Sequence, residues 1–597
     1  MNIKAEVSHV EPPYWWTEMR NPQLQLMVYG TNLHVARVSI SHPGVRIDRV
    51  ERINNPNYLF IYLNIDRVAR AGVFDITFNI NGTDQVIPYE LRLREAGSAQ
   101  RRGFSGDDVL YLIMPDRFVN GLSHNDYFAD MGDAPNRSNQ YSRHGGDIAG
   151  IASRLGYLSN LGVTGISLTP VVENNVPVGS YHGFSPTNFY KVDQRLGTND
   201  ELVSLVKAAH NRGLKIVLEV DNNHCSSRHP WIKSLPTPDW VTSDAGLVRA
   251  GQQYAHIDEH ASNYDKNMVQ NGWFSRILAD LNQKNKFLSR YLIQNTIWWI
   301  ESTGADGIKS ALYTYSDFDF LAQWNEEILI EYPNLSIAGE TWYSKEAAVA
   351  WWQRNSKLSP RNTNLKVVMD FPFATTVAPY AFTEETSVDQ GLNRVHQLLT
   401  QDFLYPDPFN ILTFVDNIDL SRFYKSKEKG LKRYKQAMAF LLTSRGIPQI
   451  TYGTEILMTG EKIDGDGMLC PDFPGGWKID RRNAFLESER ISKENEAYKY
   501  LQKLLTWRST NDAVKRGKMK QFVPDDGIYA YARYTPSETV IVMFNGKNTS
   551  GSFNTLPLTE LLHVTPIMRD VITGKRVDIT QPIRMGARDV MILQAIR

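Results

Sequence analysis

Residues 214–224 read Leu-Lys-Ile-Val-Leu-Glu-Val-Asp-Asn-Asn-His, a short apolar run that ends in a cluster of polar side chains. An apolar run of this length between helical stretches is typical of a buried parallel strand. Seven further runs of this kind begin at Val109, Val163, Ala305, Asn334, Leu365, Asn410 and Ile447. Amphipathic helical stretches separate them. Eight strands that alternate with helices predict an α/β fold, and eight is the strand number of a (β/α)8 TIM barrel.

The segments on either side of this pattern read as β-structure. Residues 74–80 alternate apolar and polar side chains, and Asn81-Gly82 supplies a hairpin turn. Residues 528–532 alternate again before the apolar run 540–544. We therefore expect three domains: an N-terminal β-sandwich over residues 1–98, a barrel over 99–515 with a short insertion after strand three at about 225–285, and a C-terminal β-sandwich over 516–597.

Composition excludes several classes of partner. Lys plus Arg number 65 and Asp plus Glu number 65, so the zero net charge predicts no nucleic-acid partner and no anionic membrane. Two cysteines, Cys225 and Cys470, are too few for a disulfide framework or a cysteine-rich zinc site. No stretch reaches the roughly 20 apolar residues of a membrane span, and no signal peptide opens the given chain. We expect a soluble protein in either the cytoplasm or the periplasm.

Polar side chains close three of the predicted barrel strands. Strand three ends in residues 219–224, strand five in Gly339-Glu340-Thr341-Trp342, and strand seven in residues 415–419, Val-Asp-Asn-Ile-Asp. Strand-end Asp and Asn are common turn residues, so one such ending would say little. Three endings in order and at barrel spacing predict a functional site at the carboxyl ends of the strands.

With these endings the chain resembles the α-amylase family, glycoside hydrolase family 13, and most closely its cyclomaltodextrinase and neopullulanase branch. The N-terminal sandwich points to that branch. The other motifs that carry the resemblance are residues 111–118 (YLIMPDRF), residues 180–184 (SYHGF), Asn223-His224, and Gly446-Ile-Pro448 followed by Tyr452-Gly453. The resemblance implies a retaining glycosidase site, in which one carboxylate attacks the sugar and a second, about 5–5.5 Å away, acts as acid and base.

Carried over by motif, the resemblance makes Glu340 the acid/base and Asp419 a third carboxylate that helps to bind and distort the sugar. Residues 307–311, Gly-Ile-Lys-Ser-Ala, stand where the family has G-x-R-x-D, so the nucleophile position falls on Ala311 and Lys309 replaces the arginine. Asp306 lies five residues before Ala311 and so on the opposite face of the strand, where it cannot replace the nucleophile. The resemblance also implies sugar contacts by four residues: Tyr111 by stacking, His182, His224 and Asn417.

Two more positions depart from the family pattern. Ile418 stands where a histidine contacts the sugar, and Glu219 stands where the motif D-x-x-x-N-H begins with aspartate. Four changed positions in one site look like drift after selection for hydrolysis relaxed. The calcium-binding loop of the branch is also altered: Leu122 replaces an aspartate, while five positions match, Asn120, Asn125, Asp126, Gly145 and Asp147. The loop either binds calcium or is an ordinary polar loop.

The favoured function is that of a degenerate family member, impaired or inactive in catalysis, that binds malto-oligosaccharides or cyclomaltodextrins. One alternative is an active hydrolase of α-1,4-glucosidic bonds in which Glu340 and Asp419 act as an inverting pair at about 6.5–9.5 Å. Another is a cleft turned to a different ligand, where Lys309 beside Ala311 favours an anion. No cofactor other than calcium is expected. Homodimers are expected from the branch, whose N-terminal domain often mediates them.

Overall fold

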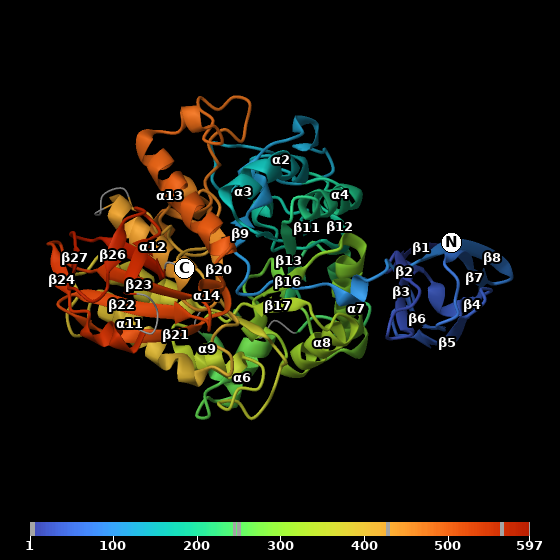
Figure 1. Cartoon of the computed structure of the whole chain (residues 1–597). Helices are drawn as coiled ribbons and strands as arrows, with labels where there is room; N and C mark the ends of the chain where they lie inside the picture. Colours follow the sequence, from blue (N-terminus) through green and yellow to red (C-terminus); the bar gives the residue numbers. More distant parts are fainter. Residues whose placement is uncertain (1–5, 243–245, 248–251, 426–429, 562–565, 596–597) are drawn as a thin grey trace.

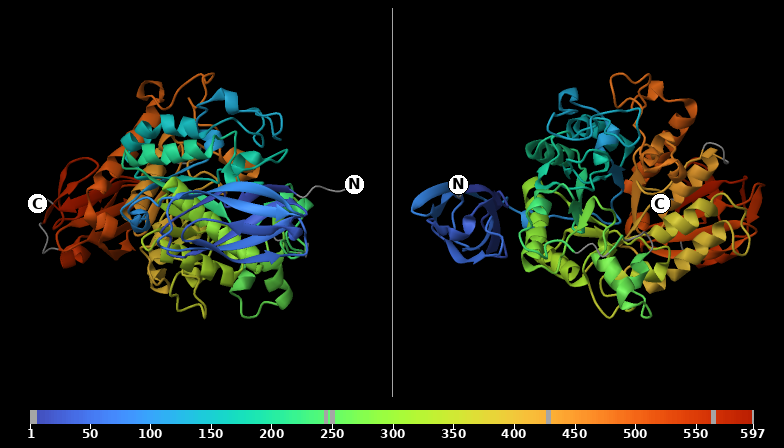
Figure 2. Two further views of the ribbon diagram at one scale, coloured as in Figure 1. Left: turned by 90° about the vertical axis from the view of Figure 1, so that its right-hand side faces the viewer. Right: turned by 180° about the vertical axis from the view of Figure 1, so that it is seen from behind.

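The computed structural model describes residues 6–242, 246–247, 252–425, 430–561 and 566–595. Figure 1 shows a central barrel between two β domains. The views in Figure 2 show that the N-terminal sheets project from the barrel, whereas the C-terminal sheets lie along its helices. None of the helices among the described residues combines the length and the hydrophobicity needed to cross a bilayer.

The barrel is closed and its eight strands are parallel, which confirms the predicted fold. The strands are β9 (Leu110–Ile113), β10 (Gly165–Leu168), β13 (Lys215–Asp221), β16 (Gly307–Ala311), β17 (Ser336–Gly339), β18 (Val367–Met369), β19 (Ile411–Thr413) and β20 (Ile447–Thr451). They neighbour one another in chain order, and β20 pairs with β9 to close the ring. Their carboxyl ends therefore meet at one mouth of the barrel.

Helices surround this ring and follow the predicted amphipathic stretches. The longer ones are α4 (Asn199–His210), α7 (Lys286–Thr303), α8 (Phe318–Glu331), α11 (Leu392–Thr400), α12 (Gly430–Thr443) and α13 (Ser492–Ser509). The shorter ones are α1 (Pro115–Phe118), α2 (Ile148–Ser153), α3 (Leu155–Leu161), α9 (Glu346–Trp352), α10 (Ala378–Ala381) and α14 (Asp512–Arg516). Asn285 caps α7 by accepting from the backbone N–H groups of Phe287 and Leu288, and Gly304 ends it in a left-handed conformation.

The N-terminal domain is a sandwich of two four-stranded sheets. One sheet has the order β1 (Glu6–Glu11), β3 (Gln23–Thr31), β6 (Tyr58–Ile65), β5 (Val45–Arg52), and the other β2 (Tyr14–Trp16), β8 (Thr83–Arg92), β7 (Gly72–Ile80), β4 (Arg37–Ile40). Two reciprocal hydrogen bonds of 2.8 Å between Gln25 and Gln294 fasten this domain to α7. Phe60 also stacks on Phe287 with ring centroids 4.3 Å apart.

The C-terminal domain also consists of two sheets. The larger has the order β21 (Lys518–Asp525), β22 (Ile528–Tyr534), β23 (Thr539–Asn545), β28 (Val590–Ala595), β25 (Ile567–Asp570), β26 (Arg576–Asp578), and the smaller pairs β24 (Gly551–Phe553) with β27 (Ile583–Met585).

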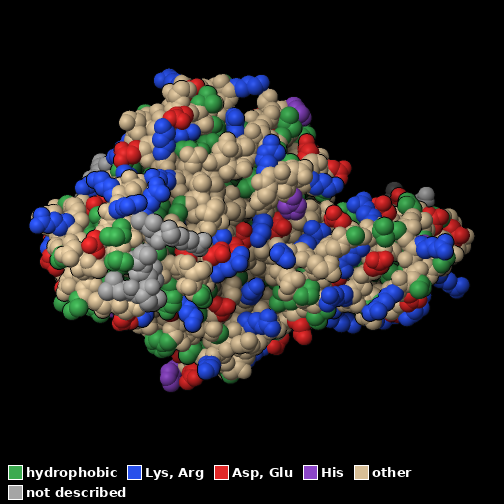
Figure 3. All heavy atoms as spheres, viewed as in Figure 1, with side chains coloured by type: hydrophobic (Ala, Val, Ile, Leu, Met, Phe, Trp, Pro, Cys, Tyr) green, Lys and Arg blue, Asp and Glu red, His purple; other side chains and the backbone are tan. Residues whose placement is uncertain are grey.

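Figure 3 shows acidic and basic side chains interspersed over one face of the molecule, as expected for a chain without net charge.

The segment after β13 forms a small insertion beside the mouth of the barrel. Its strands β14 (His224–Ser226) and β15 (Leu278–Asp280) pair antiparallel, and α5 (Pro230–Lys233) and α6 (Asn263–Asn271) lie between them in sequence. Residues 243–245 and 248–251 of this predicted insertion lie outside the described residues. The β14–β15 pair brings Asp280 opposite His224 and so adds a carboxylate to the site region.

Candidate active site at the carboxyl ends of the barrel strands

The pairing of β13 with β16 determines which side chains form the floor of the site. In the β13–β16 register Glu219 lies opposite Lys309, and Asp221 lies opposite Ala311. All four side chains are buried. Asp306 lies at the other end of β16, where its carboxylate accepts from the backbone N–H of Ile216 and pairs with His210, each at 2.8 Å. The alanine is therefore the residue at the strand end, and Asp306 does not replace it.

Lys309 and Glu219 form a buried ion pair, with 2.9 Å between Nζ and Oε1. Burial raises the pKa of Glu219, and the nearby Lys309 ammonium lowers it only in part. Burial disfavours the charged form of Lys309, yet the carboxylates of Glu219, Glu340 and Asp419 leave its pKa raised. Lysine is a point donor without the arginine fork, and glutamate is one methylene longer than aspartate. Two of the departures from the family pattern thus meet in one contact, and their interpretation as drift stays a prediction.

Glu340 follows β17 and points toward β16. Its Oε2 accepts from the backbone N–H of Leu312, the residue after Ala311, at 2.9 Å. Leu312 holds a left-handed backbone with φ of 46°, which is unusual for leucine. Burial raises the pKa of Glu340, Lys309 lowers it and Glu219 raises it. A carboxyl group with a raised pKa is suited to donate a proton near neutral pH.

Asp419 follows β19 and is only partly buried. Its backbone N–H donates to Oδ1 of Asn417 at 2.9 Å. Burial and the Glu340 charge raise the pKa of Asp419 to about 7, while Lys309 lowers it. Between the two polar residues, Ile418 is buried in the core and offers a ligand no hydrogen bond. The site thus combines the raised pKa values of Glu340 and Asp419 with the Lys309–Glu219 ion pair, and position 311 offers no oxygen nucleophile.

The two predicted histidines lie side by side at the mouth. His182 Nδ1 accepts from the backbone N–H of Phe184 at 2.9 Å, and burial lowers the pKa of His182 to about 4, so the ring is neutral at pH 7. His224 Nε2 lies 2.6 Å from the carbonyl oxygen of Phe184 and 3.2 Å from Oδ2 of Asp221. These contacts occupy His224 Nε2 within the protein, whereas among the described residues no hydrogen bond engages Nε2 of His182.

The other two predicted sugar contacts differ from each other. Asn417 is buried, and its Nδ2 has no hydrogen-bond partner among the described residues, which suits a ligand contact. Tyr111 is fully buried; its hydroxyl donates to Glu455 Oε1 at 2.8 Å and accepts from the backbone N–H of Gly453 at 3.0 Å. The ring of Tyr111 has no exposed face for a sugar, so the predicted stacking role is corrected to a structural one.

The predicted calcium loop comes together, but its oxygens accept from protein donors. Asp147 caps α2 by accepting from the backbone N–H of Gly150, and also accepts from those of Gly121 and Leu122. Both carboxylate oxygens of Asp126 lie 2.9 Å from Asn120 Nδ2, and Gly145 lies beside them. Asn125 Oδ1 is buried without a partner in the described part of the chain. The described residues hold no metal-binding group of three or more His, Cys, Asp or Glu. Calcium binding by this loop stays a prediction.

One site feature escaped sequence reasoning. Asp280 is fully buried and accepts from Thr242 Oγ1 at 2.8 Å, and burial raises the pKa of Asp280 well above its ordinary range. It lies far along the chain from β13, and only the β14–β15 pairing places it there.

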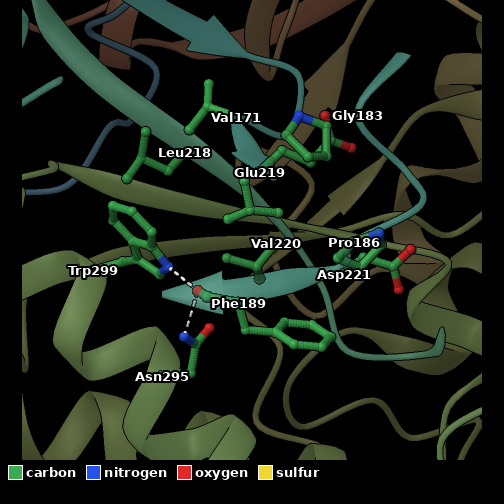
Figure 4. A pocket seen from close by; sticks show the side chains of 12 residues that line it. Val171, Gly183, Pro186, Phe189, Leu218, Glu219, Val220, Asp221, Asn295 and Trp299 are labelled. Carbon is green, nitrogen blue, oxygen red and sulfur yellow. Dashed lines mark hydrogen bonds between the residues drawn. The ribbon is translucent and has the colours of Figure 1, made fainter. Parts of the chain in front are cut away.

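A small, mostly apolar cavity lies behind β13, and Leu218 and Val220 help to line it (Figure 4). The α7 side chains Asn295 and Trp299 both donate to the carbonyl oxygen of Phe189 in this cavity.

Comparison with known proteins assigns the chain to a protein family. The family described as alpha amylase, catalytic domain, matches residues 112–520, which include β16, Glu340 and Asp419. The chain belongs to the alpha-amylase family. Cyclomaltodextrinase N-terminal and C-terminal domain families match residues 9–95 and 519–594 of this family member, on either side of the barrel.

Individual relatives are distant. A beta/alpha-amylase of Paenibacillus polymyxa is 28% identical over 75% of this family member, which spans 34% of that relative's length. A cyclomaltodextrinase of Geobacillus thermopakistaniensis is 27% identical over 74% of the chain and 69% of its own length. The crystal structure of an Anoxybacillus alpha-amylase superposes with a TM-score of 0.68 at 26% identity and covers 82% of the chain and 98% of its own.

Proposed function

We propose that this alpha-amylase family member binds α-glucan oligosaccharides or cyclomaltodextrins at the mouth of its barrel but is impaired in their hydrolysis. Ala311 carries the proposal, since it lies at the end of β16, opposite Asp221 and beside the Lys309–Glu219 pair. A methyl group cannot form the covalent intermediate of a retaining glycosidase. Loss of a nucleophile commonly lowers turnover by several orders of magnitude.

Retained polar groups support the binding half of the proposal. Asn417, His182, Glu340 and Asp419 all lie at strand ends or in loops of the same mouth, and the ring of His182 is neutral at pH 7. Neutral donors and acceptors suit an uncharged sugar. A relative named cyclomaltodextrinase, together with the cyclomaltodextrinase N-terminal and C-terminal domains, supports α-glucans as the ligand class.

A second candidate is hydrolysis with inversion. The Asp419 pKa of about 7 suits a general base that works near neutral pH, and the raised pKa of Glu340 suits the general acid. Alanine at position 311 is smaller than the family's aspartate, and this candidate mechanism places the attacking water in the volume that the shorter side chain gives up. In this reaction water attacks the anomeric carbon, Asp419 takes its proton, and Glu340 protonates the leaving oxygen as the glycosidic bond breaks.

An anionic ligand is the least supported alternative. The Lys309 ammonium is already paired with Glu219, and the charges of Glu340 and Asp419 also raise the pKa of Lys309. The cation next to Ala311 is therefore already engaged by a carboxylate and offers an anion little attraction. We therefore do not propose an anion for this site.

The experiment is calorimetric titration with maltoheptaose and with a cyclomaltodextrin, followed by product analysis of the same samples after long incubation. The proposal expects binding of either glucan and products at a rate orders of magnitude below that of active relatives. Efficient turnover that Glu340→Gln abolishes and the exposed control Glu326→Gln leaves intact would overturn the impairment. The anomeric configuration of the first product then separates inversion from retention. Absence of binding to both glucans would refute the proposal.

Homodimer formation through the N-terminal domain is also proposed, on the strength of the cyclomaltodextrinase N-terminal family match over residues 9–95. Sedimentation of the full chain and of a variant without this domain measures it. A monomer at micromolar concentration would contradict the dimer.

A further inference from the structure

A groove lies outside the barrel, between α3 and α13. Figure 1 shows the two helices side by side in the upper half of the molecule, and they contact each other. The groove has an aromatic floor formed by Tyr157, Phe485 and Tyr498, and its rim carries Arg154, Arg490 and Lys499. None of these residues belongs to the barrel mouth, so any ligand here occupies a second site.

Arg154 is a partly buried cation that lacks a counter-charge. Its guanidinium carbon lies 4.4 Å from the centre of the Phe485 ring. Its Nε is buried and has no hydrogen-bond partner among the described residues, and no charged group of the described chain acts on its pKa alongside burial. Burial lowers the pKa of Arg154, and no neighbouring carboxylate offsets that burial. A guanidinium group without a neighbouring carboxylate can accept an anionic ligand through its exposed amino groups.

Arg490 supplies a second positioned guanidinium. Its carbon lies 3.8 Å from the centre of the Tyr498 ring, and its Nε donates to the carbonyl oxygen of Ala484 at 2.8 Å. Its Nη1 donates to Asn495 Oδ1 at 3.2 Å rather than to a carboxylate. Stacking on a ring and bonds to fixed oxygens hold this side chain in place before a ligand arrives, which lowers the entropy cost of binding.

The groove lining is positively charged. Lys499 pairs with Glu487 at 2.5 Å, and Glu487 is the one carboxylate among the lining residues. Three cations therefore face one anion. Behind the floor, the Tyr157 hydroxyl donates to buried Glu455 at 2.7 Å, so this carboxylate is engaged by a protein donor. This local excess contrasts with the zero net charge of the whole chain.

We propose that this groove binds a phosphorylated sugar, with the phosphate at Arg154 and Lys499 and the sugar hydroxyls at Asn160 and Gln502. Guanidinium groups match the oxygen pairs of phosphate, and a dianion satisfies more than one cation at once. The amide side chains of Asn160 and Gln502 line the same groove and carry both donors and acceptors, as hydroxyl recognition needs. A ring such as Tyr157 suits the less polar face of a sugar.

Titration calorimetry of the full chain with glucose 1-phosphate, inorganic phosphate and glucose tests the proposal. We expect glucose 1-phosphate to bind more tightly than inorganic phosphate, glucose not to bind in the groove, and added sodium chloride to weaken the phosphate ligands. Glucan at saturating concentration blocks the barrel mouth during the titration, so the groove is measured by itself.

Variants assign the site. Arg154→Gln is expected to weaken glucose 1-phosphate at least tenfold, and Lys499→Gln several-fold. Arg482→Gln is the matched control, because Arg482 pairs with Glu494 nearby on the same segment and does not line the groove. The affinity of the Arg482→Gln variant for glucose 1-phosphate should stay within twofold of that of the unchanged chain. The melting temperature of each variant shows whether it folds.

Three results would overturn the proposal: no binding of glucose 1-phosphate at millimolar concentration, equal loss in Arg154→Gln and Arg482→Gln, or unchanged affinity in Arg154→Gln. Equal affinity for inorganic phosphate and glucose 1-phosphate would refute the sugar part.

Discussion

Lys309→Met removes the cation from the buried pair and leaves Glu219 without a partner. The two side chains are 2% and 1% exposed, so water cannot take over the lost contact. Breaking a buried pair from one side costs about 3–5 kcal/mol of unfolding free energy. At roughly 2.1 cal/mol/K per residue, a barrel over residues 99–515 has an unfolding entropy of about 0.9 kcal/mol/K, so its melting temperature should fall by about 3–6 °C.

The pH dependence gives the same prediction a second readout. Burial already raises the pKa of Glu219 despite the Lys309 charge, and removal of that charge raises it further. A carboxyl group whose pKa is higher in the folded state than in the unfolded state loses stability as pH rises, because the folded state must give up a proton that it holds more tightly. Lys309→Met should therefore be destabilised more at pH 8 than at pH 5.

Differential scanning calorimetry measures both effects. Lys284→Met is the control, since Lys284 is 55% exposed and lies 3.8 Å from Asp317; such a pair contributes about 0–1 kcal/mol. The double variant Lys309→Met with Glu219→Gln should regain part of the loss, because no charge is left buried. A fall in melting temperature no larger than that of Lys284→Met, or one independent of pH, would refute the reasoning.

Four further predictions concern Ala311, Asp419, the loop of Asp126 and Asp147, and Tyr111. Ala311→Asp should speed maltoheptaose hydrolysis at least a hundredfold, with retention at the anomeric carbon by NMR; an unchanged rate would show that position 311 does not limit catalysis. Asp419→Asn should stabilise the fold more at pH 8 than at pH 5, since the pKa of Asp419 of about 7 makes the native carboxylate costly above that pH; calorimetry at both values measures this. Calcium or a chelator should leave the melting temperature unchanged, because protein donors already satisfy Asp126 and Asp147, and a rise with calcium would restore the metal site. Tyr111→Leu should lower the melting temperature but leave glucan affinity within twofold, whereas a tenfold weaker affinity would restore the stacking role.

The fold could be predicted from the sequence because its signals are local. Each barrel strand is a short apolar run, and polar residues or glycine mark where it ends, so eight runs in order sufficed for a (β/α)8 barrel. The register that makes Ala311 a strand-end residue was also predictable, since it depends on alternation along one strand and places Asp306 on the other face.

What depended on tertiary structure was the set of contacts between strands and helices far apart in the chain. Lys309 meets Glu219 only because β16 pairs with β13, so two departures that looked independent in sequence form one ion pair. Tyr111 is buried in β9, and its hydroxyl donates to Glu455, which lies 344 residues away in the sequence. The groove exists only where α13 packs on α3. Burial and pairing set the charge and exposure of a side chain, and neither is a property of the residue's own neighbourhood in sequence.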